Sequence, residues 1–167
     1  MMVSTQVNRP HRSGASRTIP SPVGPLALVV RDESIVGLGF GEGPSTGPSL
    51  ELLDRAAREL DEYFRRERQA FDLPVAPAAD GLLGRVLAAL ARVPYGETIS
   101  YKDLTLELGL DISQVREVGA AIGRNPIAIV IPCHRVIGSD GSLVGFGGGI
   151  ERKRRLLDIE SPQLQLA

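Results

Sequence analysis

Cysteine is nearly absent from this 167-residue chain: Cys133 is the only one. A single cysteine excludes a disulfide within the chain. One cysteine and two histidines also cannot supply the four side-chain ligands of a thiolate zinc cluster. A lone thiol does not require an oxidising compartment, so we expect a cytoplasmic protein.

Long apolar runs are missing as well. No stretch approaches the length needed to cross a membrane, and Met1–Arg17 lacks the hydrophobic centre of a signal peptide. We therefore expect no membrane partner. The residues of Met1–Arg17 are rich in Ser, Arg, Asn and Pro, which predicts a flexible tail over residues 1–17.

Neither sign of charge is in large excess. Nineteen Lys and Arg face twenty Asp and Glu, and the part from Ala79 onward has ten of each. The chain thus has no basic domain, and any binding to nucleic acid would use a local patch. A hydrophobic content of 43% with 23% charged residues is typical of a soluble globular protein, with one domain or two small ones.

The first half predicts β structure followed by a helix. Residues 26–30 and 35–40 are expected strands, separated by a turn at 32–34. Residues 50–66 place apolar side chains on one stripe, which predicts an amphipathic helix. The segment 73–80, rich in Pro and Ala, is expected to be a linker between domains.

The second half begins with three predicted helices, over residues 82–92, 100–108 and 113–123. Ser100 to Asp103 has the form of a capping box, which opens the second of these helices. A glycine-containing turn then joins the second helix to the third. The pair is either a helix-turn-helix, which can place its second helix on DNA, or a plain helical hairpin.

The outer face of the helix 113–123 combines one long cation with very small residues: Arg116, Gly119, Ala120 and Gly123. A glycine inside a helix costs about 1 kcal/mol relative to alanine, so two of them need a reason. Close approach of a nucleic-acid backbone is one reason, and close packing inside the protein is the other.

The apolar run 127–131 leads into Pro132-Cys133-His134. An imidazole beside a thiol can draw its proton away and make it a nucleophile, although a lone cysteine can also be a small buried hydrophobe. In a strand, adjacent side chains point to opposite faces, so cooperation of Cys133 with His134 requires a bend. Downstream we expect a hairpin turn at 138–141, a glycine-rich loop at 145–149, and a helix over 151–160 whose basic run 152–155 faces solvent.

Taken together, these motifs resemble the O6-alkylguanine-DNA alkyltransferases (methylated-DNA–protein-cysteine methyltransferases), from about Thr18 to Glu160. The C-terminal motifs are Pro94-Tyr95-Gly96-Glu97-Thr98 with Ser100-Tyr101, Arg116-x-Val118-Gly119, Asn125-Pro126, Ile131-Pro132-Cys133-His134-Arg135-Val136-Ile137, and Gly147-Gly148-Gly149 with Arg152-Lys153. Ser21-Pro22-x-Gly24-x-Leu26 and Tyr63-Phe64 are similar to the N-terminal part of the family.

The resemblance implies an α+β fold. A small N-terminal α/β domain of ribonuclease-H-like type over residues 18–78 would precede a C-terminal winged helix-turn-helix domain over 79–167, which carries the active-site cysteine. No metal and no cofactor is implied, because the ligands of the zinc site found in some members are absent from this sequence.

The resemblance also implies a chemistry. Cys133 would attack the alkyl carbon on O6 of guanine and keep the alkyl group, with His134 as base through a water. Glu160 would hold the imidazole, and Asn125 would tie the active-site segment together.

The implied partner is double-stranded DNA containing alkylated guanine, or O4-alkylthymine, bound by a monomer through the minor groove. The target base must be flipped out of the duplex, with Arg116 entering the stack and Tyr101 crowding the neighbouring phosphate. The further substrate and DNA contacts implied are Gly119, Ala120, Arg135, Val136, Phe146 and Gly147.

The chain departs from the family pattern at several positions. Phe146 stands where the family usually has a tyrosine, Glu117 replaces an alanine beside Arg116, and residues 82–87 are more aliphatic than usual. Two other functions therefore remain. A catalytically silent lesion-binding protein would normally lack the cysteine. An unrelated Cys-His hydrolase would have no use for Arg116.

Overall fold

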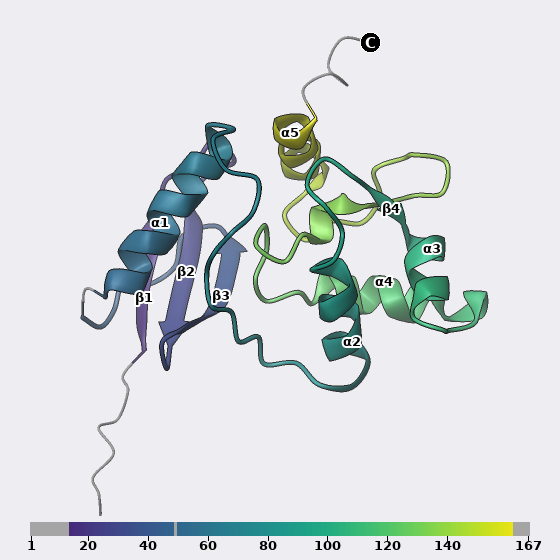
Figure 1. The fold of residues 1–167 in the computed structure, drawn as a ribbon, viewed down its shortest axis with the longest axis horizontal. Helices are drawn as coiled ribbons and strands as arrows, with labels where there is room; N and C mark the ends of the chain where they lie inside the picture. Colours follow the sequence, from purple (N-terminus) through teal and green to yellow (C-terminus); the bar gives the residue numbers. More distant parts are fainter. Residues whose placement is uncertain (1–13, 49, 162–167) are drawn as a thin grey trace, which may run out of the picture.

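The structure is a computed structural model that describes residues 14–48 and 50–161. Its N-terminal part is an antiparallel sheet of three strands in the order β1-β2-β3, covered on one face by α1 (Figure 1). The strands are β1 (Ala15–Ile19), β2 (Leu26–Arg31) and β3 (Ser34–Phe40), and the helix is α1 (Glu51–Phe64). The two strands and the helix expected in this half are confirmed.

The core of this N-terminal part consists of alternate side chains of β2 together with side chains of α1. Leu26, Leu28 and Val30 of β2 are buried at every second position, and Leu53 and Leu60 of α1 pack in the same core. Burial of such side chains supplies about 1.5–3 kcal/mol each, which holds the helix on the sheet.

The start of β1 corrects the expected tail. Ala15 pairs with Val30 and is 2% exposed, so residues 15–17 belong to the sheet. The strand has a buried residue at each end, Ala15 and Ile19, and three half-buried polar residues between them, so the Ser and Arg content of the segment concealed it. Residues 1–13 of the expected tail lie outside the described residues.

The segment expected as a linker is attached to the sheet. Val75 bridges Ile35 in parallel, the amide of Ile35 donates to the carbonyl of Pro74 at 2.8 Å, and the amide of Ala76 donates to the carbonyl of Ile35 at 2.9 Å. Backbone pairing with β3 therefore fixes the path of the chain between the two parts.

The C-terminal part is helical, with one two-stranded parallel sheet. Its elements are α2 (Gly81–Leu90), β4 (Ile99–Ser100), α3 (Tyr101–Glu107), α4 (Val115–Gly123), β5 (Val136–Ile137) and α5 (Ile150–Glu160). Helix α4 packs against both α2 and α3, as in a helix-turn-helix (Figure 1). The Ser100 hydroxyl accepts from the amide of Asp103 at 3.0 Å, which confirms the expected start of α3.

The run 127–131 is a buried turn and not a strand. Only Ile127 bridges β3, at Leu38, and Ile129 has a φ of +69°. The amide of Ile131 donates to the carbonyl of Ile127 at 3.0 Å. The chain then forms the short 3-10 helix η2 (Cys133–Arg135), which provides the bend that joint action of Cys133 and His134 requires.

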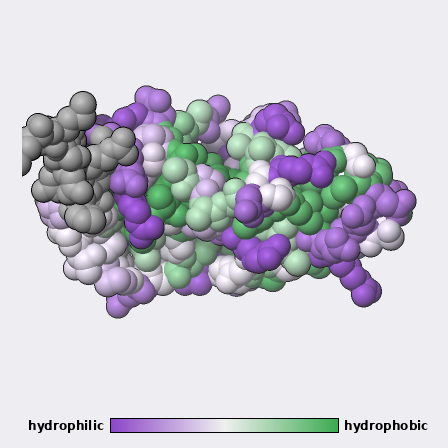
Figure 2. All heavy atoms as spheres, turned by 90° about the horizontal axis from the view of Figure 1, so that it is seen from below, coloured by the Kyte–Doolittle hydropathy of each residue, from purple (hydrophilic) through white to green (hydrophobic). Residues whose placement is uncertain are grey.

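The turn expected at 138–141 is confirmed by the amide of Gly138, which donates to the carbonyl of Ser142 at 2.8 Å. The chain continues from Ser142 to α5 as a loop. On the face shown in Figure 2, hydrophobic and hydrophilic side chains are interspersed. Within residues 14–48 and 50–161, no helix is long and apolar enough to cross a membrane.

Candidate active site

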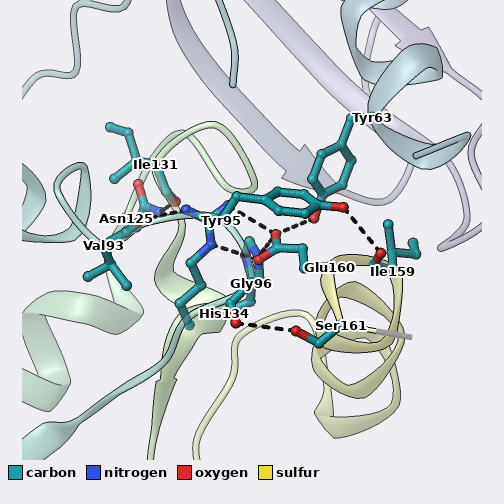
Figure 3. Close-up of polar contacts among 11 residues, drawn as sticks. Tyr63, Val93, Tyr95, Gly96, Asn125, Ile131, His134, Ile159, Glu160 and Ser161 are labelled. Carbon is teal, nitrogen blue, oxygen red and sulfur yellow. Dashed lines mark hydrogen bonds and ion pairs between the residues drawn. The ribbon is translucent and has the colours of Figure 1, made fainter. Parts of the chain in front are cut away.

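A buried carboxylate at the end of α5 organises the site (Figure 3). One oxygen of Glu160, Oε2, lies 2.6 Å from Nε2 of His134 and accepts from the Tyr63 hydroxyl at 2.6 Å. The other oxygen, Oε1, accepts from Nε of Arg135 at 2.7 Å, and Nη1 of Arg135 donates to the carbonyl of Val93 at 2.6 Å. We call Tyr63, His134, Arg135 and Glu160 the polar relay.

Charge and hydrogen bonding fix the protonation of the relay. Burial alone would raise the pKa of Glu160, but the hydrogen bonds and charges of His134 and Arg135 lower it to about 2. Burial, offset in part by Glu160, lowers the pKa of His134, so its imidazole is neutral at neutral pH. The carboxylate therefore accepts the proton on Nε2, and Nδ1 carries the free lone pair.

That lone pair has no hydrogen-bond partner among the described residues. Within this part of the chain, Nδ1 of His134 is the one buried side-chain nitrogen or oxygen that makes no hydrogen bond. A buried, unsatisfied acceptor costs about 1–3 kcal/mol, so its presence points to a functional use.

The thiol of Cys133 lies on the same 3-10 helix as His134 and is 7% exposed. Burial raises the pKa of Cys133, and interactions with Asn125 and Lys153 partly offset that rise. The amide of Asn125 also donates to the carbonyl of Ile131 at 2.8 Å, while its oxygen accepts from the amide of Ile127 at 3.0 Å. Asn125 thus holds the turn that carries the thiol, as expected.

Lys153 is a residue that sequence reasoning missed. It was expected to face solvent within the basic run 152–155, but it is fully buried. Its ammonium donates to the carbonyl of Val144 at 3.1 Å and lies 5.6 Å and 5.9 Å from the ring centres of Tyr101 and Phe146. Lys153 shares one face of α5 with the buried Leu156 and Glu160, a spacing that could have revealed it.

A cavity of about 200 Å³ opens beside the thiol. Cys133, Asn125, Phe146 and Gly147 contribute to its lining, together with residues 38–40 of β3. The structure therefore brings the expected Phe146 and Gly147 to the cysteine.

The outer face of α4 is accessible as expected: Arg116, Ala120 and Gly123 are exposed, and Gly119 is half-buried. A methyl group at Gly119 would meet the Tyr101 ring at an ordinary 3.8 Å, and one at Gly123 would meet no atom of the described residues within 4 Å. Internal packing does not require either glycine, which leaves close approach of an external surface as the reason for them.

Two residues expected to contact substrate or DNA are turned inward. The Arg135 side chain is buried in the polar relay, because pairing with Glu160 keeps the guanidinium inside. The Val136 side chain is fully buried in β5, which pairs with Ile99 of β4. Neither side chain is available to DNA.

The Tyr101 hydroxyl is also engaged within the protein. It donates toward the carbonyls of Val144 at 2.9 Å and Gly145 at 3.1 Å, so in this structure the ring is anchored to the loop beside the cavity.

A cysteine next to a histidine–carboxylate pair and beside a helix-turn-helix points to a transferase that acts on DNA, and comparison with known proteins identifies the family. Residues 16–77 match the 6-O-methylguanine DNA methyltransferase ribonuclease-like domain, and residues 83–162 match the DNA binding domain of the same proteins. The chain belongs to the 6-O-methylguanine DNA methyltransferase family, which confirms the resemblance and the two-domain fold.

Similar proteins cover most of the chain. It is 39% identical over 154 residues to the methylated-DNA–protein-cysteine methyltransferase of Methanosarcina barkeri, covering 88% of this chain and 97% of that protein. The crystal structure of Mycobacterium tuberculosis O6-methylguanine methyltransferase is 39% identical, with a TM-score of 0.81 over 90% of this chain and 94% of that one. The M. tuberculosis OGT structure in complex with DNA is 41% identical, with a TM-score of 0.81 over 89% of this chain and 93% of the other.

Proposed function

We propose that this protein repairs DNA by direct reversal, as a single-turnover methylated-DNA–[protein]-cysteine S-methyltransferase. Cys133 attacks the alkyl carbon of O6-alkylguanine. A bond forms between that carbon and Sγ, the bond between the carbon and O6 breaks, and its electron pair leaves with the guanine. The alkyl group stays on the protein as a thioether, so each molecule acts once.

The observation that carries this proposal is the unpartnered Nδ1 of His134. Glu160 holds the proton on Nε2, which leaves Nδ1 able to take the proton of Cys133 through a water. The same proton can then pass to the departing guanine. The carboxylate stays ionised throughout, because its pKa lies near 2.

The helix-turn-helix is the part of the protein that we expect to bind DNA. A relative of the same fold has been crystallised with DNA, and the small residues on the face of α4 allow a DNA backbone to come close. We propose that α4 binds the minor groove, that Arg116 fills the gap left by the flipped base, and that Gly119 and Ala120 contact the backbone. Tyr101 would crowd the neighbouring phosphate. The protein would act as a monomer, in the cytoplasm.

The alternative of a silent lesion-binding protein is not favoured, because the nucleophile and its complete relay are present. A hydrolase is also disfavoured, since it would have no use for the glycines and the exposed arginine on α4.

Incubation with duplex DNA containing O6-methylguanine tests the proposal. We expect intact-mass and peptide analysis to find one methyl group on Cys133, with stoichiometric loss of the lesion. The Cys133→Ser variant should bind the same duplex and take up no methyl, since a serine hydroxyl has a far higher pKa than a thiol. Methyl uptake by the serine variant, or methylation of another residue in the wild type, would rule out the assignment.

A further inference from the structure

The N-terminal domain supplies part of the wall of the cavity beside Cys133. Leu38, Gly39 and Phe40 of β3 line it, although the cysteine and the glycine-rich loop belong to the C-terminal domain. The Phe40 ring meets the Phe146 ring edge to face, with centres 5.6 Å apart and planes at 65°. Two aromatic rings from different domains therefore close one side of the cavity.

The rings of Phe40 and Phe146, which we call the cavity wall, cannot move closer to the backbone of the glycine-rich loop. A methyl group placed on Gly148 would lie 2.6 Å from the Phe40 ring and 2.9 Å from the Phe146 ring. Carbon atoms do not approach that closely, so both rings rest directly on the bare backbone of Gly148.

Arg152 of α5 fixes the wall from the outside. Its Nε donates to the carbonyl of Val23 at 2.8 Å, and its Nη1 donates to the carbonyl of Gly148 at 3.0 Å. Its guanidinium carbon lies 5.5 Å from the centre of the Phe40 ring, within the range of a cation–π contact. One side chain thus connects the N-terminal domain, the glycine-rich loop and the Phe40 ring.

The cavity is small for the substrate it has to hold. Ligand pockets that bury drug-sized molecules measure about 300–1,000 Å³, whereas this one has about 200 Å³. Ile122 and Gly123, at the end of α4, line the cavity together with residues 38–40 of β3 and Cys133. A bulky O6 substituent that reaches Cys133 therefore has to share this small space with the β3 residues.

We propose that Phe40 is a specificity-determining residue, whose ring limits the size of the O6-alkyl group that reaches Cys133. This inference rests on the proposed function. The N-terminal domain then selects the substrate through one residue: methyl and other small groups fit, and large aromatic groups are disfavoured by the ring.

The test measures single-turnover transfer to Cys133 from duplexes containing O6-methylguanine or O6-benzylguanine, for wild type, Phe40→Ala and Phe40→Leu. Filling or emptying a hydrophobic pocket by even one methylene changes discrimination by about 10- to 200-fold. We therefore expect the benzyl-to-methyl rate ratio to rise at least about tenfold in Phe40→Ala, and less in Phe40→Leu. Val36→Ala is the matched control, since Val36 is half-buried on the same strand and does not line the cavity.

Measuring both substrates distinguishes failure of the Phe40 proposal from failure of the proposed function. An unchanged ratio in Phe40→Ala, or an equal rise in Val36→Ala, would overturn the role of Phe40 while the methyl transfer of the wild type still stands. If Phe40→Ala fails to fold, the ratio in Phe40→Leu decides in the same way. If the wild type transfers neither group to Cys133, the proposed function itself fails, and this inference fails with it.

Discussion

The polar relay and the cavity wall lie on two sides of the same cysteine and are built by opposite means. The relay is buried and polar, and a single carboxylate receives hydrogen bonds from three side chains. The wall consists of two partly buried rings resting on a loop of glycines. Proton transfer needs one fixed geometry, whereas the shape of the wall decides only which group fits.

Both regions also depend on the N-terminal domain. Tyr63 of α1 completes the relay, and Phe40 of β3 completes the wall. Because the polar relay is buried and hydrogen-bonded, substitutions in it should impair both folding and chemistry. Substitutions in the partly buried cavity wall should alter selectivity or rate with little loss of stability.

Glu160→Gln should have the largest effect. It removes the charge that compensates the buried Arg135, and breaking a buried ion pair costs about 3–5 kcal/mol. In serine proteases, the corresponding loss of the carboxylate lowers turnover by about 10⁴-fold. We expect both losses, measured by urea unfolding and by single-turnover methyl transfer; a stable variant with wild-type transfer would contradict the role of the relay.

The acid stability of the wild type follows from the same carboxylate. The pKa of Glu160 falls from its ordinary 4.5 to about 2 on folding. The folded state therefore binds fewer protons than the unfolded state in this window, so the contribution of Glu160 is present above pH 4.5 and disappears as the pH falls toward 2. In Glu160→Gln, the fall in unfolding free energy over this window should be smaller.

Tyr63→Phe tests the contribution of the N-terminal domain to the relay. The change removes one hydrogen bond to a charged group, worth about 1.5–3 kcal/mol, and leaves the His134 and Arg135 contacts in place. We expect the unfolding free energy to fall by about this amount, with a modest decrease in transfer rate. Phe64→Leu, one position along on α1, is the control; an equal loss there would mean that α1 as a whole, and not the hydroxyl, matters.

Lys153→Met tests the residue that lies between the two regions. The buried ammonium lowers the pKa of the Cys133 thiol against the opposing effect of burial, so the neutral variant should raise that pKa. Each unit of increase lowers the thiolate fraction, and hence the rate below the thiol pKa, about tenfold. The rate of methyl transfer from an O6-methylguanine duplex should recover as the pH rises. Arg155→Met, at an exposed position of the same helix, should keep the wild-type pH profile of that rate. An unshifted profile in Lys153→Met would show a purely structural role.

The sequence predicted the chemistry better than the contacts that support it. Cys133, His134 and Asn125 lie within a short segment, so local motifs could identify them. Tyr63 and Glu160 are 97 residues apart in sequence, and nothing in either segment indicates that the Tyr63 hydroxyl donates a hydrogen bond to the Glu160 carboxylate. The place of Phe40 in the cavity could not be predicted for the same reason, because only folding brings β3 close to Cys133.

Two features of the site could not be predicted, for local physical reasons. The apolar run 127–131 folds as a buried turn, and its composition could not reveal this, because burial on all sides produces the same composition in a strand and in a buried turn. The inward direction of Arg135 could not be inferred from composition, since arginine is usually exposed and its pairing with Glu160 depends on the position of α5.

Phe146→Tyr changes the wall without enlarging it, and it should have the smallest effect of these substitutions. The ring lies beside the Phe40 ring and the Lys153 ammonium, at the cavity that would receive the guanine. A hydroxyl there could donate a hydrogen bond to the departing guanine. One donor aimed at developing charge in a dry site is worth about 2.7–4 kcal/mol at most.

Other donors will already supply part of this stabilisation, so we expect first-order methyl transfer at saturating DNA to become about tenfold faster, within that limit. Lesion affinity should hardly change, because the hydroxyl acts mainly on the transition state. The Tyr101 hydroxyl cannot easily take this role, since it is already held by the carbonyls of Val144 and Gly145. A tyrosine variant no faster than wild type would therefore mean that a donor other than Tyr101, such as Lys153 or a backbone amide, already stabilises the leaving guanine, or that residue 146 does not reach the base.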